Sequence, residues 1–135
     1  MEVDYDGRCF GCGPLNEEGL RMTFVPEDGV SFVEFEVPAR YQSWKGVVHG
    51  GIVALLLDEA VGWAAWHAGH PGVTGKLEVR FRQPMRLGER VRIAGRVEEI
   101  RRSLVRATGW IDRLTDGARV ADASATLMEV AARTD

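Results

Sequence analysis

The sequence predicts an α+β domain in which an antiparallel β-sheet wraps around one long central α-helix. Three observations support this fold class. Residues 50–68 are apolar around almost the whole helical circumference, which is typical of a helix buried on most sides. Two short strand patterns precede this segment, and four more follow it. With 135 residues, of which 45% are hydrophobic, the chain is long enough for one domain, expected over residues 1–135, with a core that needs no metal or disulfide support.

The chain before the helix is predicted to contain turns and two short strands. Residues 1–19 are rich in glycine and are expected to form turns. A first strand is expected at Leu20–Val25. The turn signal Glu27-Asp28-Gly29 separates it from a second strand, Val30–Val37, which a proline ends. Residues 39–48 are expected to form a loop that leads into the helix.

The helix itself is predicted over Gly50–Ala68. Gly69 is expected to cap its C-terminus, and Pro71 prevents its continuation. Two carboxylates, Asp58 and Glu59, lie within this apolar segment. Because burying an unpaired charge is costly, at least one of them is expected to have a partner or a function.

After the helix, the hydrophobic pattern changes to alternation. Every second residue of Lys76–Arg82 is apolar, which predicts a strand with one face on a core and the other in water. Val91–Glu99, Val105–Asp112 and Val120–Val130 continue this pattern. One small sheet cannot cover a helix that is apolar on all sides. We therefore expect a second subunit, joined through sheet edges or across the helices.

Composition argues against several classes of function. The net charge of −3 does not favour a nucleic-acid partner. The longest apolar stretch, Val47–Leu57, is too short to span a bilayer, and the acidic N-terminus lacks a signal-peptide pattern. With only Cys9 and Cys12, the chain has no disulfide framework. These features favour a cytoplasmic protein without nucleic-acid or membrane partners.

The start of the helix carries the clearest chemical signal. His49-Gly50-Gly51 places free backbone N–H groups at the positive end of the helix dipole. Glycine has no side chain to block a ligand, so Gly50 or Gly51 is expected to polarise a carbonyl group. Asp58 follows nine residues after the histidine. Together these parts indicate a site that polarises a carbonyl and activates water.

Five segments carry a family resemblance, and they are Cys9–Gly13, Asn16–Leu20, His49–Gly51, Leu57–Glu59 and Phe81–Pro84. They resemble the hotdog-fold acyl-CoA thioesterases, specifically the branch similar to phenylacetyl-CoA thioesterase. The resemblance covers most of the chain and implies hydrolysis of a small, medium-chain or aryl acyl-CoA without a cofactor. It also implies a homodimer, often paired into a tetramer. In such dimers, the carboxylate of one subunit meets the N–H near the helix start of its partner.

The resemblance also implies individual roles. Asp58 occupies the family's carboxylate position, as a general base on water or as a nucleophile that gives an anhydride. Glu59 lies about 100° further around the helix, so it cannot serve the same site equally and is expected to contact substrate. His49 either contacts the thioester or caps the helix. Thr74 either positions the water or is simply a hydroxyl at a strand start.

The chain departs from the family pattern at Ser43, where related enzymes commonly have Asn or Gln to hold the water or the thioester. Either Gln42 takes this role through a loop shift or the role is lost. Arg80 and Arg82 alternate on the polar face of a strand. They either contact the phosphates of coenzyme A or are simply solvated.

Two further questions stay open. Cys9 and Cys12 form a C-x-x-C motif, but a zinc site usually needs four ligands and only three histidines are spare. A metal-free turn with small buried thiols is therefore expected. The chain could also bind acyl-CoA without turnover, and the absence of Asn or Gln at Ser43 favours this alternative. The sequence is less consistent with a dehydratase or hydratase on the same fold, because it lacks the His-containing loop patterns of those enzymes.

Overall fold

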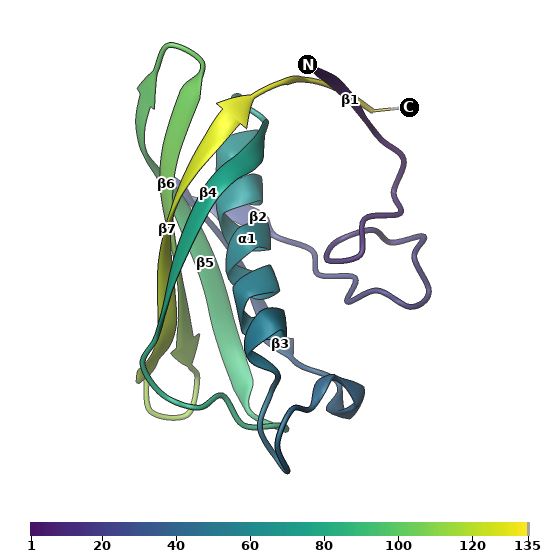
Figure 1. Cartoon of the computed structure of the whole chain (residues 1–135), viewed down its shortest axis with the longest axis vertical. Coiled ribbons are helices and arrows are strands. Elements are labelled where there is room, and N and C mark those ends of the chain that lie inside the picture. Colours follow the sequence, from purple (N-terminus) through teal and green to yellow (C-terminus); the bar gives the residue numbers. More distant parts are fainter. Residues whose placement is uncertain (135) are drawn as a thin grey trace.

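A six-stranded antiparallel sheet covers one side of a long helix (Figure 1). The computed structural model describes residues 1–134, and the side chains of residues 1–131. Across the sheet, the strands lie in the order β2 (Val25–Glu27), β3 (Val30–Glu36), β5 (Arg90–Arg101), β6 (Leu104–Arg113), β7 (Arg119–Glu129) and β4 (Gly72–Phe81). The helix α1 (Gly50–His67) packs on one face of this sheet. This arrangement confirms the predicted fold class. Within the described part of the chain, no helix is both long and apolar enough to cross a membrane.

The two ends of the chain lie together, which the sequence did not indicate. The short strand β1 (Glu2–Tyr5) pairs in parallel with β8 (Ala131–Thr134). Figure 1 shows that the segment after β1 then runs along the side of α1 opposite the sheet. This N-terminal segment covers part of the side of α1 for which the sequence predicts a second subunit, and that subunit stays a prediction.

The prediction of a strand at Leu20–Val25 is wrong, because the observed strand β2 begins where the predicted one ends. Strand pairing begins only at Val25. The preceding residues alternate as a strand would, and Leu20, Met22 and Phe24 are buried. Their backbone, however, bonds to the N-terminal loop: the Leu20 N–H donates to the Phe10 carbonyl at 2.8 Å. Burial alone produced the alternating pattern. A short η1 helix (Ala39–Tyr41) occupies part of the loop before α1.

The helix packs directly on the sheet because one strand offers a glycine at the contact. A Cβ atom built on Gly95 of β5 would lie only 2.3 Å from the carbonyl oxygen of Ala60 in α1. The helix residues that face the sheet are Val53, Leu56, Leu57, Ala60, Val61, Ala64 and Ala65. They leave the opposite side of α1 for the N-terminal segment and for the site described below.

This contact gives a stability prediction. Gly95→Ala is expected to lower the free energy of unfolding by about 1–3 kcal/mol, because overpacking forces the helix away from the sheet. The matched control is Gly62→Ala, within α1, where a Cβ meets nothing within 4 Å. That change is expected to raise the free energy of unfolding by about 0.5–1 kcal/mol. Urea unfolding followed by circular dichroism measures the free energy of unfolding of both variants. Equal changes in Gly95→Ala and Gly62→Ala would contradict the close contact between α1 and β5.

Candidate active site

A pocket of about 470 Å³ lies on the side of α1 that faces away from the sheet, and it contains Asp58. Its wall combines the middle of α1, the start of β4 and the N-terminal segment. The residues that line it are Tyr5, Cys9, Cys12, Asp58, Glu59, Gly62, Trp63, Trp66, Gly72, Val73 and Thr74. The pocket therefore places the carboxylate of α1 beside apolar and aromatic surface.

Asp58 and Thr74 are in direct contact at the edge of this pocket. The Thr74 hydroxyl donates a hydrogen bond to Asp58 Oδ1 at 2.6 Å. This bond holds Oδ1 and does not involve the second carboxylate oxygen, Oδ2. In the single chain, Asp58 is partly buried and Thr74 is exposed.

A β-bulge aims Thr74 at the helix. The pairing of β4 with β7 shifts register between Thr74 and Lys76. Strand side chains alternate, so without the bulge Thr74 would share the outer face with Lys76. With the bulge, Thr74 pairs with Leu127 on the face that carries the core. The sequence pattern did not predict this bulge, although Gly75 at that position is the residue type that a bulge favours.

The helix start distinguishes the two glycines. His49 is the N-cap of α1, and its Nδ1 accepts a hydrogen bond from the Gly51 N–H at 2.8 Å. The Gly51 donor is therefore occupied. For the Gly50 N–H, no acceptor is found among the residues that the structure describes. Gly50 is exposed and borders a second pocket of about 360 Å³, together with Ser43 and Phe81.

Asp58 and Gly50 do not face the same space within one chain. They are eight positions apart on α1, which corresponds to about 12 Å along the helix axis. They also border different pockets. A single thioester carbonyl cannot contact both groups of one chain.

The loop before α1 uses its polar side chains internally. Ser43 Oγ donates to the Val47 carbonyl at 3.3 Å, and Gln42 Oε1 accepts from the Gly46 N–H at 2.8 Å. Ser43, rather than Gln42, borders the pocket of Gly50. The structure thus gives no loop shift that would bring Gln42 to that pocket, and its proposed replacement of the missing Asn or Gln stays a prediction.

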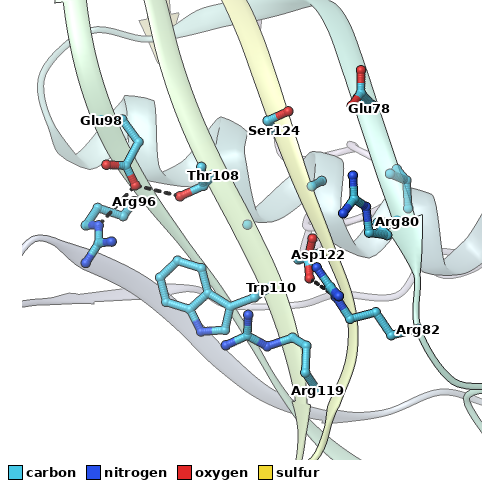
Figure 2. A pocket seen from close by; sticks show the side chains of 13 residues that line it. Glu78, Arg80, Arg82, Arg96, Glu98, Thr108, Trp110, Arg119, Asp122 and Ser124 are labelled. Carbon is cyan, nitrogen blue, oxygen red and sulfur yellow. Dashed lines mark hydrogen bonds and ion pairs between the residues drawn. The ribbon is translucent and has the colours of Figure 1, made fainter.

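Arg80 and Arg82 lie on the outer face of the sheet. Figure 2 shows them in front of the strands, with α1 behind, in a hollow of about 580 Å³ around Trp110. Arg82 forms an ion pair with Asp122 and also borders the pocket of Gly50. Neither arginine lines the Asp58 pocket. Their contact with coenzyme A phosphates stays a prediction.

Glu59 has different partners from Asp58. The Cys9 thiol donates to Glu59 Oε1 at 3.3 Å, and the Tyr5 hydroxyl lies 3.7 Å from Cys12 Sγ. Burial, and to a lesser degree the nearby Asp58 charge, raises the pKa of Glu59. Burial also raises the pKa values of Tyr5 and Cys12. Tyr5 was missed by sequence reasoning, because nothing local shows that the N-terminal strand returns to the middle of α1.

Comparison with known proteins identifies relatives of the whole fold. A family model described as the thioesterase superfamily matches residues 45–118. The crystal structure of protein RHA08564, a thioesterase superfamily protein, has a TM-score of 0.85 and 26% identity. The match covers 91% of this chain and 61% of that one, so the chain spans about three fifths of that protein. No curated protein matches significantly.

Two further structures share the fold at lower identity. The smu.793 protein of Streptococcus mutans, bound to acetyl CoA, has a TM-score of 0.76 and 24% identity, covering 89% of this chain and 98% of that one. The E. coli PaaI protein, from the phenylacetic acid degradation operon, also has a TM-score of 0.76. It is 18% identical, and the match covers 86% of this chain and 84% of that one.

Proposed function

Because the chain belongs to the thioesterase superfamily, we propose that it hydrolyses the thioester of a small, medium-chain or aryl acyl-CoA. The observation that carries this proposal is the hydrogen bond between Thr74 and Asp58 in a pocket of about 470 Å³. A carboxylate held by a hydroxyl beside apolar surface is suited to activate water next to an acyl group. Acetyl CoA bound to the S. mutans protein, and coenzyme A bound to a hypothetical thioesterase of Streptococcus pneumoniae, support the ligand class.

Asp58 would act through the carboxylate oxygen that Thr74 does not hold. As a general base, it takes a proton from water, and the hydroxide attacks the carbonyl carbon. The C–S bond then breaks, the coenzyme A thiolate leaves, and the proton passes to its sulfur. As a nucleophile, Asp58 instead attacks the carbonyl carbon and expels the coenzyme A thiolate, which leaves an anhydride. Water then hydrolyses this anhydride to the free acid and regenerates the Asp58 carboxylate, and the proton released passes to the thiolate. The contacts of Asp58 are compatible with both routes.

The Streptococcus pneumoniae thioesterase supports the pairing of these two residue types. One of its solved structures carries alanine in place of an aspartate, and another carries alanine in place of a threonine sixteen positions later. Asp58 and Thr74 have the same separation of 16 residues. We therefore assign Thr74 to positioning the carboxylate and the water.

The carbonyl-polarising donor would come from a second subunit. Gly50 has the free N–H, but it lies about 12 Å along the helix from Asp58. The strand β4 ends the sheet, and an edge strand can pair with the same strand of another chain. A symmetric homodimer formed in this way would place Gly50 of one subunit near Asp58 of its partner. Such dimers could pair further into tetramers.

Ser43 supports a second candidate function, the binding of acyl-CoA without turnover. Its hydroxyl bonds to its own loop, and it offers no amide group to hold a water molecule or the thioester. A site that lacks this contact would bind the ligand and hydrolyse it slowly or not at all. Fold alone does not decide between the two functions.

Thiol release from a panel of short-chain, long-chain and aryl acyl-CoAs separates these candidates. We expect turnover of short, medium or aryl substrates by a species that light scattering shows to be a dimer or tetramer. Tight acyl-CoA binding without thiol release from any substrate would instead favour the second candidate function, binding without turnover. A monomer at micromolar concentration would contradict the two-subunit site.

A further inference from the structure

The N-terminal loop brings three metal-ligating side chains together. One ligand atom each of Cys9, Cys12 and Glu59 lies within 4.8 Å of the others. The sequence alone argues against a metal, because it offers only a lone C-x-x-C pair. The fold supplies a third ligand that lies 50 residues away from Cys9 in the sequence.

The backbone of this loop is shaped around the cluster. The Gly13 N–H donates to the Cys9 carbonyl at 2.8 Å, which closes a tight turn over the C-x-x-C segment. A Cβ atom on Gly11 would lie 2.4 Å from Glu59 Cδ, and one on Gly13 would lie 2.4 Å from the Cys9 backbone nitrogen. Only glycine allows the loop to approach the carboxylate so closely.

The pocket around this cluster lacks a balancing positive charge. It is lined by two cysteines, two carboxylates and a tyrosine, and no lysine or arginine is among its lining residues in the described chain. The Glu59 carboxylate interacts with the Cys9 and Cys12 thiols and with the Trp63 side chain, none of which carries a positive charge. A bound cation would compensate the carboxylates and would take both thiols as thiolates.

We propose that Cys9, Cys12 and Glu59 bind a thiophilic divalent metal ion, with zinc as the best match, and leave one coordination position open to the Asp58 pocket. Zinc accepts cysteine sulfur and carboxylate oxygen in tetrahedral sites, whereas calcium and magnesium prefer oxygen ligands only. Ideal tetrahedral bond lengths imply a sulfur–oxygen separation of about 3.5 Å. The Cys9–Glu59 separation of 3.3 Å is close to this value.

Metal binding would replace the thiol protons with the ion, so each bound zinc would release up to two protons from Cys9 and Cys12. The ion would tie the N-terminal segment to α1 beside Asp58. The fourth position would hold water. This proposal does not depend on thioesterase activity, because the three ligands alone define the site.

Zinc content is the direct test. The whole protein is purified in a metal-free reductant, stripped with a chelator and titrated with zinc chloride, and bound zinc is measured by elemental analysis. We expect zinc stoichiometric with the chain. Cys9→Ser, Cys12→Ser and Glu59→Gln should each lower the affinity by at least about 10²-fold, because even changes outside the ligand shell cost 10–100-fold. Glu129→Gln, at a carboxylate outside the pocket, is the matched control and should bind like wild type.

Cobalt substitution gives a second readout that does not rely on activity or on variant stability. Co²⁺ in the wild-type site should show sulfur-to-metal charge-transfer absorption and the visible bands of a tetrahedral ion. Both signals should be lost in Cys12→Ser and partly restored in Cys12→His. The proposal would be overturned if reduced wild type binds no zinc, if the cysteine variants bind it equally, or if the cobalt spectrum lacks sulfur ligation.

Discussion

Replacing Asp58 with asparagine is expected to reduce kcat for acyl-CoA hydrolysis by about 10²–10⁴-fold, the usual contribution of a general base. Asparagine keeps the shape of the side chain, and its Oδ1 can still accept the Thr74 hydrogen bond of 2.6 Å. What the variant loses is the basic or nucleophilic oxygen. The fold should therefore persist while turnover stops. Steady-state thiol release and circular dichroism measure the two quantities on the same preparation.

Asp112→Asn is the matched control, because Asp112 lies on β6 and pairs with Arg119 away from the pocket. It should keep wild-type turnover. Full activity in Asp58→Asn would remove this carboxylate from the mechanism. Glu59 would then be the next candidate, although its present contact is with a cysteine thiol rather than with Thr74.

The second large effect is expected from Gly50→Pro, which removes the backbone N–H that would polarise the carbonyl. Loss of one such donor lowers kcat by about 10²–10³-fold in other enzymes. Proline suits the first position of a helix. The preceding residue, His49, already has the extended backbone that proline requires, with φ −57° and ψ 133°. The helix should therefore form normally.

Gly50→Ala separates the N–H from the shape of the site. Alanine keeps the donor, and its Cβ would lie 3.7 Å from a Phe81 ring carbon, which is ordinary contact. The alanine variant reports the effect of the added methyl group alone. If proline and alanine lower kcat equally, the N–H of Gly50 does not stabilise the transition state.

Much of the fold could be predicted because its elements carry strong periodic signals. The expected helix Gly50–Ala68 and the observed α1, Gly50–His67, differ by one residue. The alternating segments after it are all strands of the sheet. The errors lie in the N-terminal part, where burial without strand pairing gave Leu20–Val25 a false strand pattern. The parallel pair of β1 with β8 joins the two ends of the chain, a contact that no local pattern encodes.

The candidate site also has a part that the sequence could predict and a part that only the fold shows. Asp58 and Thr74 could be named from the family resemblance, and the structure brings them together. Three features depended on the fold. The bulge beside Thr74 sets which face that side chain takes. The His49 cap occupies Gly51 and leaves Gly50 as the free donor. The contact of Glu59 with the cysteine loop could not be seen in a sequence where these residues lie 50 positions apart.

The central claim is that each active site takes Asp58 from one subunit and Gly50 from the other. Mixing the inactive Asp58→Asn and Gly50→Pro variants tests it most directly. In a hybrid dimer, one site would combine the intact Asp58 of one chain with the intact Gly50 of the other. After random subunit exchange, about a quarter of wild-type activity should return, since half of the dimers are hybrids with one of two sites intact. No recovery in mixtures shown by mass spectrometry to contain hybrids would contradict a site shared between subunits.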